Sequence, residues 1–216
     1  MFYIIEIVLC TAVLCLGTNY LTLPSKARWY AVHCAVNALV SVWTIPYVYI
    51  MLTESTPDYT DGSPLPSIFV MSLHLYHTIS YTLNRGDIVH HTVMLLVLTI
   101  PLCNPEFLGF SNYSLFFLCG LPGGIDYYLM YLVETKGFSR LKEKHYNIYL
   151  NTWLRSLGIL YGVFRCYNDY LMGYINGYIA APVILALTWN AQFYTSEVAQ
   201  SYGYHCAMMQ VKAQHK

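Results

Sequence analysis

Charged residues are scarce in this chain. Asp, Glu, Lys and Arg together make up 10% of its 216 residues, whereas a soluble domain carries about 25%. Eleven basic residues balance eleven acidic ones, so no net positive field is available to attract nucleic acid. Repeats, low-complexity tracts and linkers are also absent. The seven cysteines form no C-x-x-C pair, and we interpret most of them as small buried hydrophobic residues.

Hydrophobic residues, by contrast, make up 56% of the chain. A span needs roughly 20 apolar residues to cross a hydrocarbon core of about 30 Å. The N-terminal stretch lacks the basic region and cleavage site of a signal peptide, so we interpret it as the first span. Helices are favoured over a barrel because the apolar runs do not alternate with period two. Apolar stretches occur at about 2–21, 29–52, 67–84, 88–103, 111–133, 147–167 and 172–194.

These stretches predict an all-α, polytopic transmembrane bundle of about seven spans. We divide it into a first span with its cytoplasmic turn (1–28), a transmembrane domain (29–200) and a short cytoplasmic tail (201–216). The segment Gly120–Gly124, which reads G-L-P-G-G, predicts a packing kink or a helix interruption just before Asp126.

The charges predict the orientation of the bundle. With seven spans, one side receives the basic residues Lys26, Arg28, Arg85, Lys136, Arg140, Lys142, Lys144, Lys212 and Lys216. The other side receives the acidic residues Glu54, Asp58, Asp61, Glu106 and Asp169. Because Lys and Arg collect in cytoplasmic loops, we expect a lumenal N-terminus and a cytoplasmic C-terminus. Asn112-Tyr113-Ser114 is then a glycosylation sequon on the lumenal side.

Several ionisable residues fall inside the predicted spans, where they are costly and usually face the bundle interior. Counting from the span ends places six of them in one layer in the cytoplasmic half: His74, His77, His90, His91, Asp126 and Arg155. Four spans contribute to this layer. It is the strongest functional signal in the sequence. Arg155 and Asp126 are also candidates for a buried structural ion pair.

Two motifs resemble the TLC domain family of membrane proteins, which includes the ceramide synthases. Residues 85–92 read R-G-D-I-V-H-H-T, with His90-His91 at the head of a span, and 121–128 read L-P-G-G-I-D-Y-Y before Glu134 and Lys136. The resemblance covers roughly residues 30–200 and implies a helical bundle that encloses a lipid-sized cavity. Ceramide synthases have a further His-Asp-x-x-Asp element where this chain has Asp126 alone, which separates the chain from them within the family.

The resemblance implies a catalytic pair, His90 and His91, faced by Asp126. A neutral imidazole can remove a proton from an attacking group or accept an acyl group, and a carboxylate can orient the imidazole. The chemistry that fits is acyl transfer from acyl-CoA to a lipid amine or hydroxyl, with acyl-CoA as co-substrate and no bound cofactor or metal. We assign His74, His77 and Arg155 to substrate binding, membrane lipids as partners, and the endoplasmic reticulum or another endomembrane as the location.

Other readings remain open at this stage. A non-catalytic protein that binds, senses or escorts lipids fits the His-His pair about as well. His74–Thr78 is also similar to the histidine box of fatty acid elongases, although Thr78 stands where that box has His. Four imidazoles suggest a metal site, but membrane di-iron hydroxylases use about eight histidines in three boxes. A channel or transporter is less favoured because the polar residues form one layer and not a continuous path.

Overall fold

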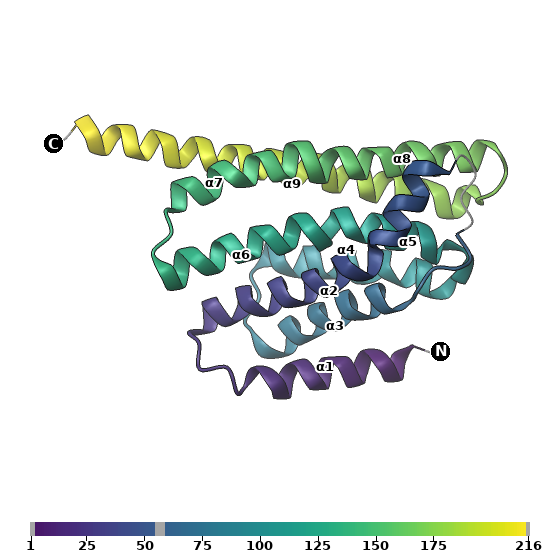
Figure 1. The fold of residues 1–216 in the computed structure, drawn as a ribbon, viewed down its shortest axis with the longest axis horizontal. Coiled ribbons are helices and arrows are strands. Elements are labelled where there is room, and N and C mark those ends of the chain that lie inside the picture. The colour runs from purple at the N-terminus through teal and green to yellow at the C-terminus, as the bar shows by residue number, and fades with distance from the viewer. Residues whose placement is uncertain (1–2, 55–58, 215–216) are drawn as a thin grey trace. The chain divides into compact units, whose positions relative to one another are not determined.

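The computed structural model describes residues 3–54 and 59–214, and all regular secondary structure within these ranges is helical (Figure 1). This confirms the all-α class. Over the described ranges, the helices form seven continuous runs. Asp58 and Lys216, which enter the charge argument, lie outside the described residues. The elements are α1 (Ile4–Thr18), α2 (Ser25–Thr53), α3 (Leu65–Ser80), α4 (Arg85–Cys103), η1 (Pro105–Phe107), α5 (Leu108–Leu115), η2 (Phe116–Gly120), α6 (Leu121–Lys136), α7 (Arg140–Tyr149), η3 (Leu150–Arg155), α8 (Ser156–Leu171) and α9 (Gly177–Gln214).

Two compact units make up the chain, residues 1–124 and 125–216. The division between span, transmembrane domain and tail predicted from sequence concerns the membrane and stays a prediction. Helix α9 continues through residue 201 without a break, so the segment expected to be a tail is helical up to Gln214.

In the first unit, α3 packs against α1, α2 and α4, and α2 also packs against α5 and η2. Successive helices α1 to α4 run in alternating directions (Figure 1). The largest fully buried side chains here include Tyr76, Phe110 and Tyr113. A π-helical turn, η2, directly precedes α6 and its Pro122. The predicted interruption is therefore a widened turn, which leaves room for a proline that lacks an N–H and crowds the preceding turn.

In the first unit, many apolar side chains are exposed and many polar side chains are buried. Val42 is 68% exposed and Leu96 67%, while Asn37 is 1% exposed and Thr44 0%. Buried hydroxyls such as those of Ser41 and Thr44 donate to the carbonyl one turn back, which satisfies them inside a helix. Within the described residues, three helical runs are long and apolar enough to cross a membrane: Ser25–Thr53, Arg85–Cys103 and Pro105–Lys136. Apolar residues facing outward and polar ones facing inward are the pattern of helices that pack in lipid.

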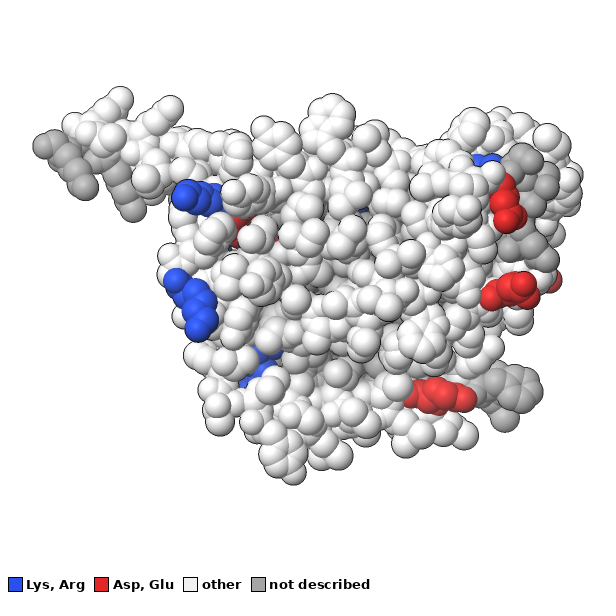
Figure 2. Space-filling model, viewed as in Figure 1, with Lys and Arg blue, Asp and Glu red and all other residues white. Residues whose placement is uncertain are grey.

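Charges in the first unit separate by sign. Basic residues lie near the α1–α2 and α3–α4 turns, and acidic residues lie near the α2–α3 and α4–η1 turns. Because these turns alternate between the two ends of an antiparallel bundle, the signs gather at opposite ends, as the lower part of Figure 2 shows. Asp87 is an exception at the basic end, where it caps α4.

In the second unit, the run from α7 through η3 to α8 packs along α9. The η3 segment, Leu150–Arg155, is a second π-helical turn. Helix α9 has 38 residues, which at 1.5 Å per residue gives a length of about 57 Å. Apolar side chains again face outward, as Leu185 of α9 and Phe164 of α8 show.

Candidate functional site

Five imidazoles gather at the basic end of the first unit. We call them the histidine cluster: His33 from α2, His74 and His77 from α3, and His90 and His91 from α4. Helix α3 ends at Ser80 and α4 begins at Arg85, so the α3 pair lies in its last two turns and the α4 pair in its second turn. A tight helical hairpin therefore brings both pairs to one level.

The start of α4 is held by a reciprocal capping box. The backbone N–H of Asp87 donates to Asn84 Oδ1 at 3.0 Å, and the backbone N–H of Asn84 donates to Asp87 Oδ2 at 3.1 Å. Such a box satisfies two free donors at a helix N-terminus. Asp87 thus positions the His90-His91 pair through the backbone of α4.

His77 lies in an aromatic stack at the centre of the cluster. Its ring centroid is 4.0 Å from that of Trp29, with an interplanar angle of 11°, and 4.1 Å from that of His33, with an angle of 19°. The Tyr81 ring lies nearly perpendicular to that of Trp29, with the two ring centroids 4.6 Å apart. His77 is 1% exposed, and its Nε2 has no hydrogen-bond partner among the described residues. Two imidazolium rings this close would repel each other, so uncharged rings fit the stack.

The α4 pair lies against His74. The His74 and His91 ring centroids are 4.7 Å apart, and those of His74 and His90 are 5.4 Å apart. His91 is buried and its Nδ1 lies 3.4 Å from Thr78 Oγ1. His74 Nδ1 lies 2.7 Å from the Val70 carbonyl oxygen, one turn back. His90 is only half-buried, so it is the more accessible ring of the pair.

The structure thus brings four predicted residues together: His74, His77, His90 and His91. His33, which is not part of the layer predicted from sequence, joins them. Asp126 and Arg155 belong to the second unit, so the predicted His–His–Asp centre and the substrate-binding role of Arg155 stay predictions.

Asp126 takes part in a chain of buried and partly buried polar contacts within the second unit. We call it the polar ladder: Asp126 from α6, Glu143 and Asn147 from α7, and Asn151 and Arg155 from η3. Asn151 Nδ2 donates to Asn147 Oδ1 at 3.0 Å, and Arg155 Nη1 donates to Asn151 Oδ1 at 3.2 Å. Asp126 and Arg155 are thereby linked through two asparagines. The Arg155 guanidinium also lies over the Tyr194 ring at 4.2 Å.

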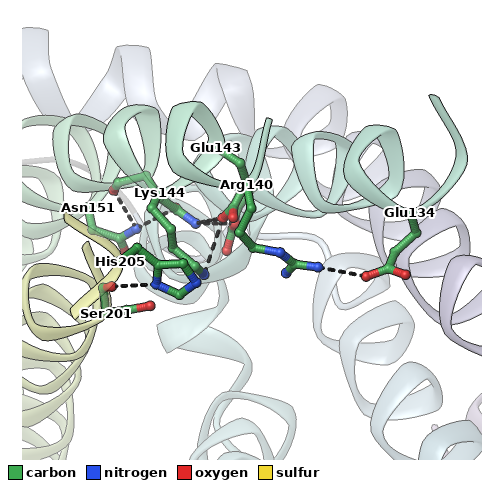
Figure 3. Close-up of polar contacts among 9 residues, drawn as sticks. Glu134, Arg140, Glu143, Lys144, Asn151, Ser201 and His205 are labelled. Atoms are coloured by element: carbon green, nitrogen blue, oxygen red, sulfur yellow. Dashed lines mark hydrogen bonds and ion pairs between the residues drawn. The ribbon is translucent and has the colours of Figure 1, made fainter. Parts of the chain in front are cut away.

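Asn147 has a fixed orientation in this ladder. Its Nδ2 donates to both carboxylates, to Asp126 Oδ1 and, at 3.1 Å, to Glu143 Oε1. Figure 3 shows Glu143, Lys144 and Asn151 close together on the α7–η3 helix, while Arg140 reaches Glu134 at 2.8 Å. The side-chain oxygen of Asn147 accepts from Asn151 Nδ2. Exchanging the amide oxygen and nitrogen of Asn147 would therefore break its contacts with Asp126, Glu143 and Asn151.

Glu143, Asn147 and Asn151 are site residues that sequence reasoning missed. They lie in and after a charged run that we expected to be a loop. A signal was nevertheless present: Glu143, Asn147, Asn151 and Arg155 recur every four residues. Residues four apart lie on the same face of a helix, and the pattern identifies a polar stripe once the run is known to be helical.

Two other sequence features have structural outcomes. Among the described residues, no group of three or more His, Cys, Asp or Glu side chains has a geometry that could hold a metal ion. The side chain of Asn112, in the sequon, is 0% exposed. An oligosaccharide needs an exposed asparagine, so the folded chain does not present this sequon for modification.

Comparison of the chain with protein-family models, with curated proteins and with solved structures gives no match.

Proposed function

We propose that this chain is an integral membrane protein of about seven spans, similar to the TLC family, that transfers an acyl group to a lipid acceptor at its histidine cluster. The observation that supports this most is the convergence of five imidazoles from three helices in a bundle whose outer surface is apolar. Polar side chains inside a membrane bundle are costly and commonly mark functional sites.

His90 is the proposed base, because it is the accessible member of the pair. Its neutral imidazole takes the proton from the acceptor hydroxyl or amine as that group attacks the thioester carbonyl of acyl-CoA. The carbon–sulfur bond then breaks, and the proton passes to the departing thiolate, which leaves as coenzyme A. His91, packed between His74 and Thr78, positions α4 and the neighbouring ring.

The charge pattern supports an orientation. Because basic turns face the cytoplasm in membrane proteins, the proposed orientation has the N-terminus in the lumen and the histidine cluster in the cytoplasmic half. There the polar CoA moiety can approach from the water while an acyl chain lies among the helices. The endoplasmic reticulum, or another endomembrane, is the proposed location.

The test is a lipid profile of cells that express the wild-type chain or a His90→Ala/His91→Ala double variant at matched abundance. We expect a lipid class that appears with the wild type and falls about 100-fold or more in the variant, the scale of a lost general base. A His145→Ala/His205→Ala double variant is the matched control, because both of its histidines lie in the second unit, outside the cluster.

A second function, lipid binding without catalysis, is favoured by the stacked and buried rings of His33 and His77, which pack like core residues. If the wild-type and variant profiles agree while both proteins fold, acyl transfer at this pair is wrong. A lipid that copurifies with the wild type and is lost from a Trp29→Ala variant would then support a binding role.

A further inference from the structure

One hydrogen bond fixes the position of the proton on His74. Its Nδ1 lies 2.7 Å from the Val70 carbonyl oxygen, and a carbonyl oxygen only accepts hydrogen bonds, so Nδ1 is the donor. The ring centroids of His74 and His91 are 4.7 Å apart in a buried setting, where two imidazolium charges would repel each other. A neutral imidazole has a single N–H. We therefore assign His74 as the Nδ1–H tautomer, with an unprotonated Nε2 that accepts hydrogen bonds.

Thr78 fixes the proton of His91 in the same way. Its hydroxyl donates to the His74 carbonyl oxygen at 2.9 Å and has no second proton to give. The Thr78 oxygen is left to accept from His91 Nδ1, which lies 3.4 Å away. His91 is then also the Nδ1–H tautomer, and its Nε2 is likewise an acceptor.

His74 and His91 lie on the same side of His90. Their ring centroids are 5.4 Å and 5.8 Å from that of His90, but only 4.7 Å from each other. Both rings are buried whereas His90 is half-buried, so the two rings border its inner side and leave another side accessible. Imidazoles this close can join through an N–H···N hydrogen bond, in which the nitrogens are about 3 Å apart. Two neutral acceptors therefore lie beside the proposed base.

We propose that His74 and His91 are positioning residues that accept, through Nε2, a hydrogen bond from the imidazolium that His90 becomes during acyl transfer. The inference rests on the acyl transfer proposed above. An imidazolium has an N–H on both nitrogens, so taking up the proton of the acceptor group creates a second donor on His90. A buried donor without a partner is costly, and a fixed acceptor removes that cost.

The two rings act on His90 as the carboxylate of a Ser-His-Asp triad acts on its histidine, which becomes charged only during the reaction. Because the charged ring is absent from the resting site, these contacts lower the reaction barrier and do not tighten substrate binding. His74 and His91 gain no proton themselves. The proton passes from the acceptor group to His90 and then to the departing thiolate.

The first test reads the tautomers without any substrate. Nitrogen NMR of the histidine-labelled protein in lipid nanodiscs at about pH 7, where a free imidazole is mostly neutral, separates unprotonated from protonated ring nitrogens by chemical shift. We expect Nδ1–H and an unprotonated Nε2 for His74 and His91, with signals assigned by their loss in His74→Gln and His91→Gln. His205 is an internal reference, because its Nδ1 lies 2.8 Å from the Ser201 carbonyl oxygen. A proton at Nε2 of His74 or His91 would overturn the proposal, even if the protein makes a product.

The second test compares the lipid profiles of two double variants. His74→Phe/His91→Phe keeps two rings in the packing without an acceptor, whereas His74→Gln/His91→Gln keeps an acceptor oxygen and loses the rings. We expect the phenylalanine variant to have the higher Tm, yet to lose about 10-fold or more of the product, the scale of a lost supporting partner of an imidazole. The glutamine variant should retain more product. His205→Phe is the matched control, because it removes an imidazole with the same kind of Nδ1 contact from the second unit.

A purely structural role predicts the opposite order of product levels. Equal losses in the two double variants, or a larger loss with glutamine, would therefore contradict the acceptor role. Where a double variant folds poorly, the single exchanges at His74 carry the same comparison. A wild type that makes no product would instead overturn the acyl transfer, and this role with it, even where the spectrum shows the expected tautomers.

Discussion

Replacing Gly62 with alanine is expected to cost about 3 kcal/mol or more of stability, at the upper end of the cost of overpacking. A Cβ at this position would lie 2.1 Å from the backbone nitrogen of Gly109 and 2.2 Å from the carbonyl carbon of Leu108. Both are main-chain atoms of α5 and cannot rotate away. Gly109 N–H donates to the Tyr59 carbonyl at 3.0 Å, so the clash would also separate the segment before α3 from α5.

Thermal unfolding of the purified protein in detergent would measure this. Gly203→Ala is the matched control, because a Cβ at Gly203, within α9, meets nothing within 4 Å. There the exchange should raise stability by up to about 1 kcal/mol, the helix propensity difference. If Gly62→Ala and Gly203→Ala had the same Tm, the close approach between residue 62 and α5 would be wrong.

The second large effect is expected at His77, where alanine and phenylalanine should differ sharply. His77→Ala removes a ring that stacks on both Trp29 and His33 and should cost about 3 kcal/mol, as other buried aromatic truncations do. His77→Phe keeps a ring in the stack and eliminates an imidazole nitrogen, Nε2, that has no partner among the described residues. We expect its Tm to lie close to that of the wild type.

This pair of variants also tests the predicted role of His77 in substrate binding. A phenylalanine variant that is as stable as the wild type and yields the same lipid profile would make His77 a packing residue. One that is stable but loses the product would show that the imidazole itself is needed. A phenylalanine variant as unstable as the alanine one would show that the nitrogen atoms support the fold.

The fold was predictable from sequence where hydrophobicity decides it. The apolar run 29–52 corresponds to α2 at Ser25–Thr53, and 88–103 corresponds to α4 at Arg85–Cys103. What the apolar stretches missed is polar, namely α7 and the part of α9 beyond residue 194. Helix α7 occupies a charged run, and α9 extends to Gln214. In α7 and in the C-terminal part of α9, many polar side chains are compatible with a helix. A search for apolar stretches does not detect such helices.

The candidate site was predictable in part, for a similar reason. His74, His77, His90 and His91 could be placed at one level, because depth along a span follows from counting residues. Their neighbours could not be named. Trp29 stacks on His77 through packing of α2 against α3, which no spacing within one helix reports. The partners of Asp126 were likewise hidden, because Glu143 lies in a charged run expected to be a loop. Asn147 begins the predicted span 147–167, and no spacing within that span pairs it with Asp126.

Helix α9 has a mechanical consequence. In the proposed seven-span arrangement, in which α9 crosses the membrane, a hydrocarbon core of about 30 Å would take up roughly 20 of its 38 residues, and a tilt large enough to immerse the whole helix would exceed the usual range of up to about 40°. About 18 residues, or some 27 Å, then stand beyond the hydrocarbon as a stiff arm. A change of about 10° in the tilt of the helix would move the far end of that arm by about 5 Å. In that arrangement, a small motion within the bilayer would become a displacement in the water that a probe attached near Cys206 can report.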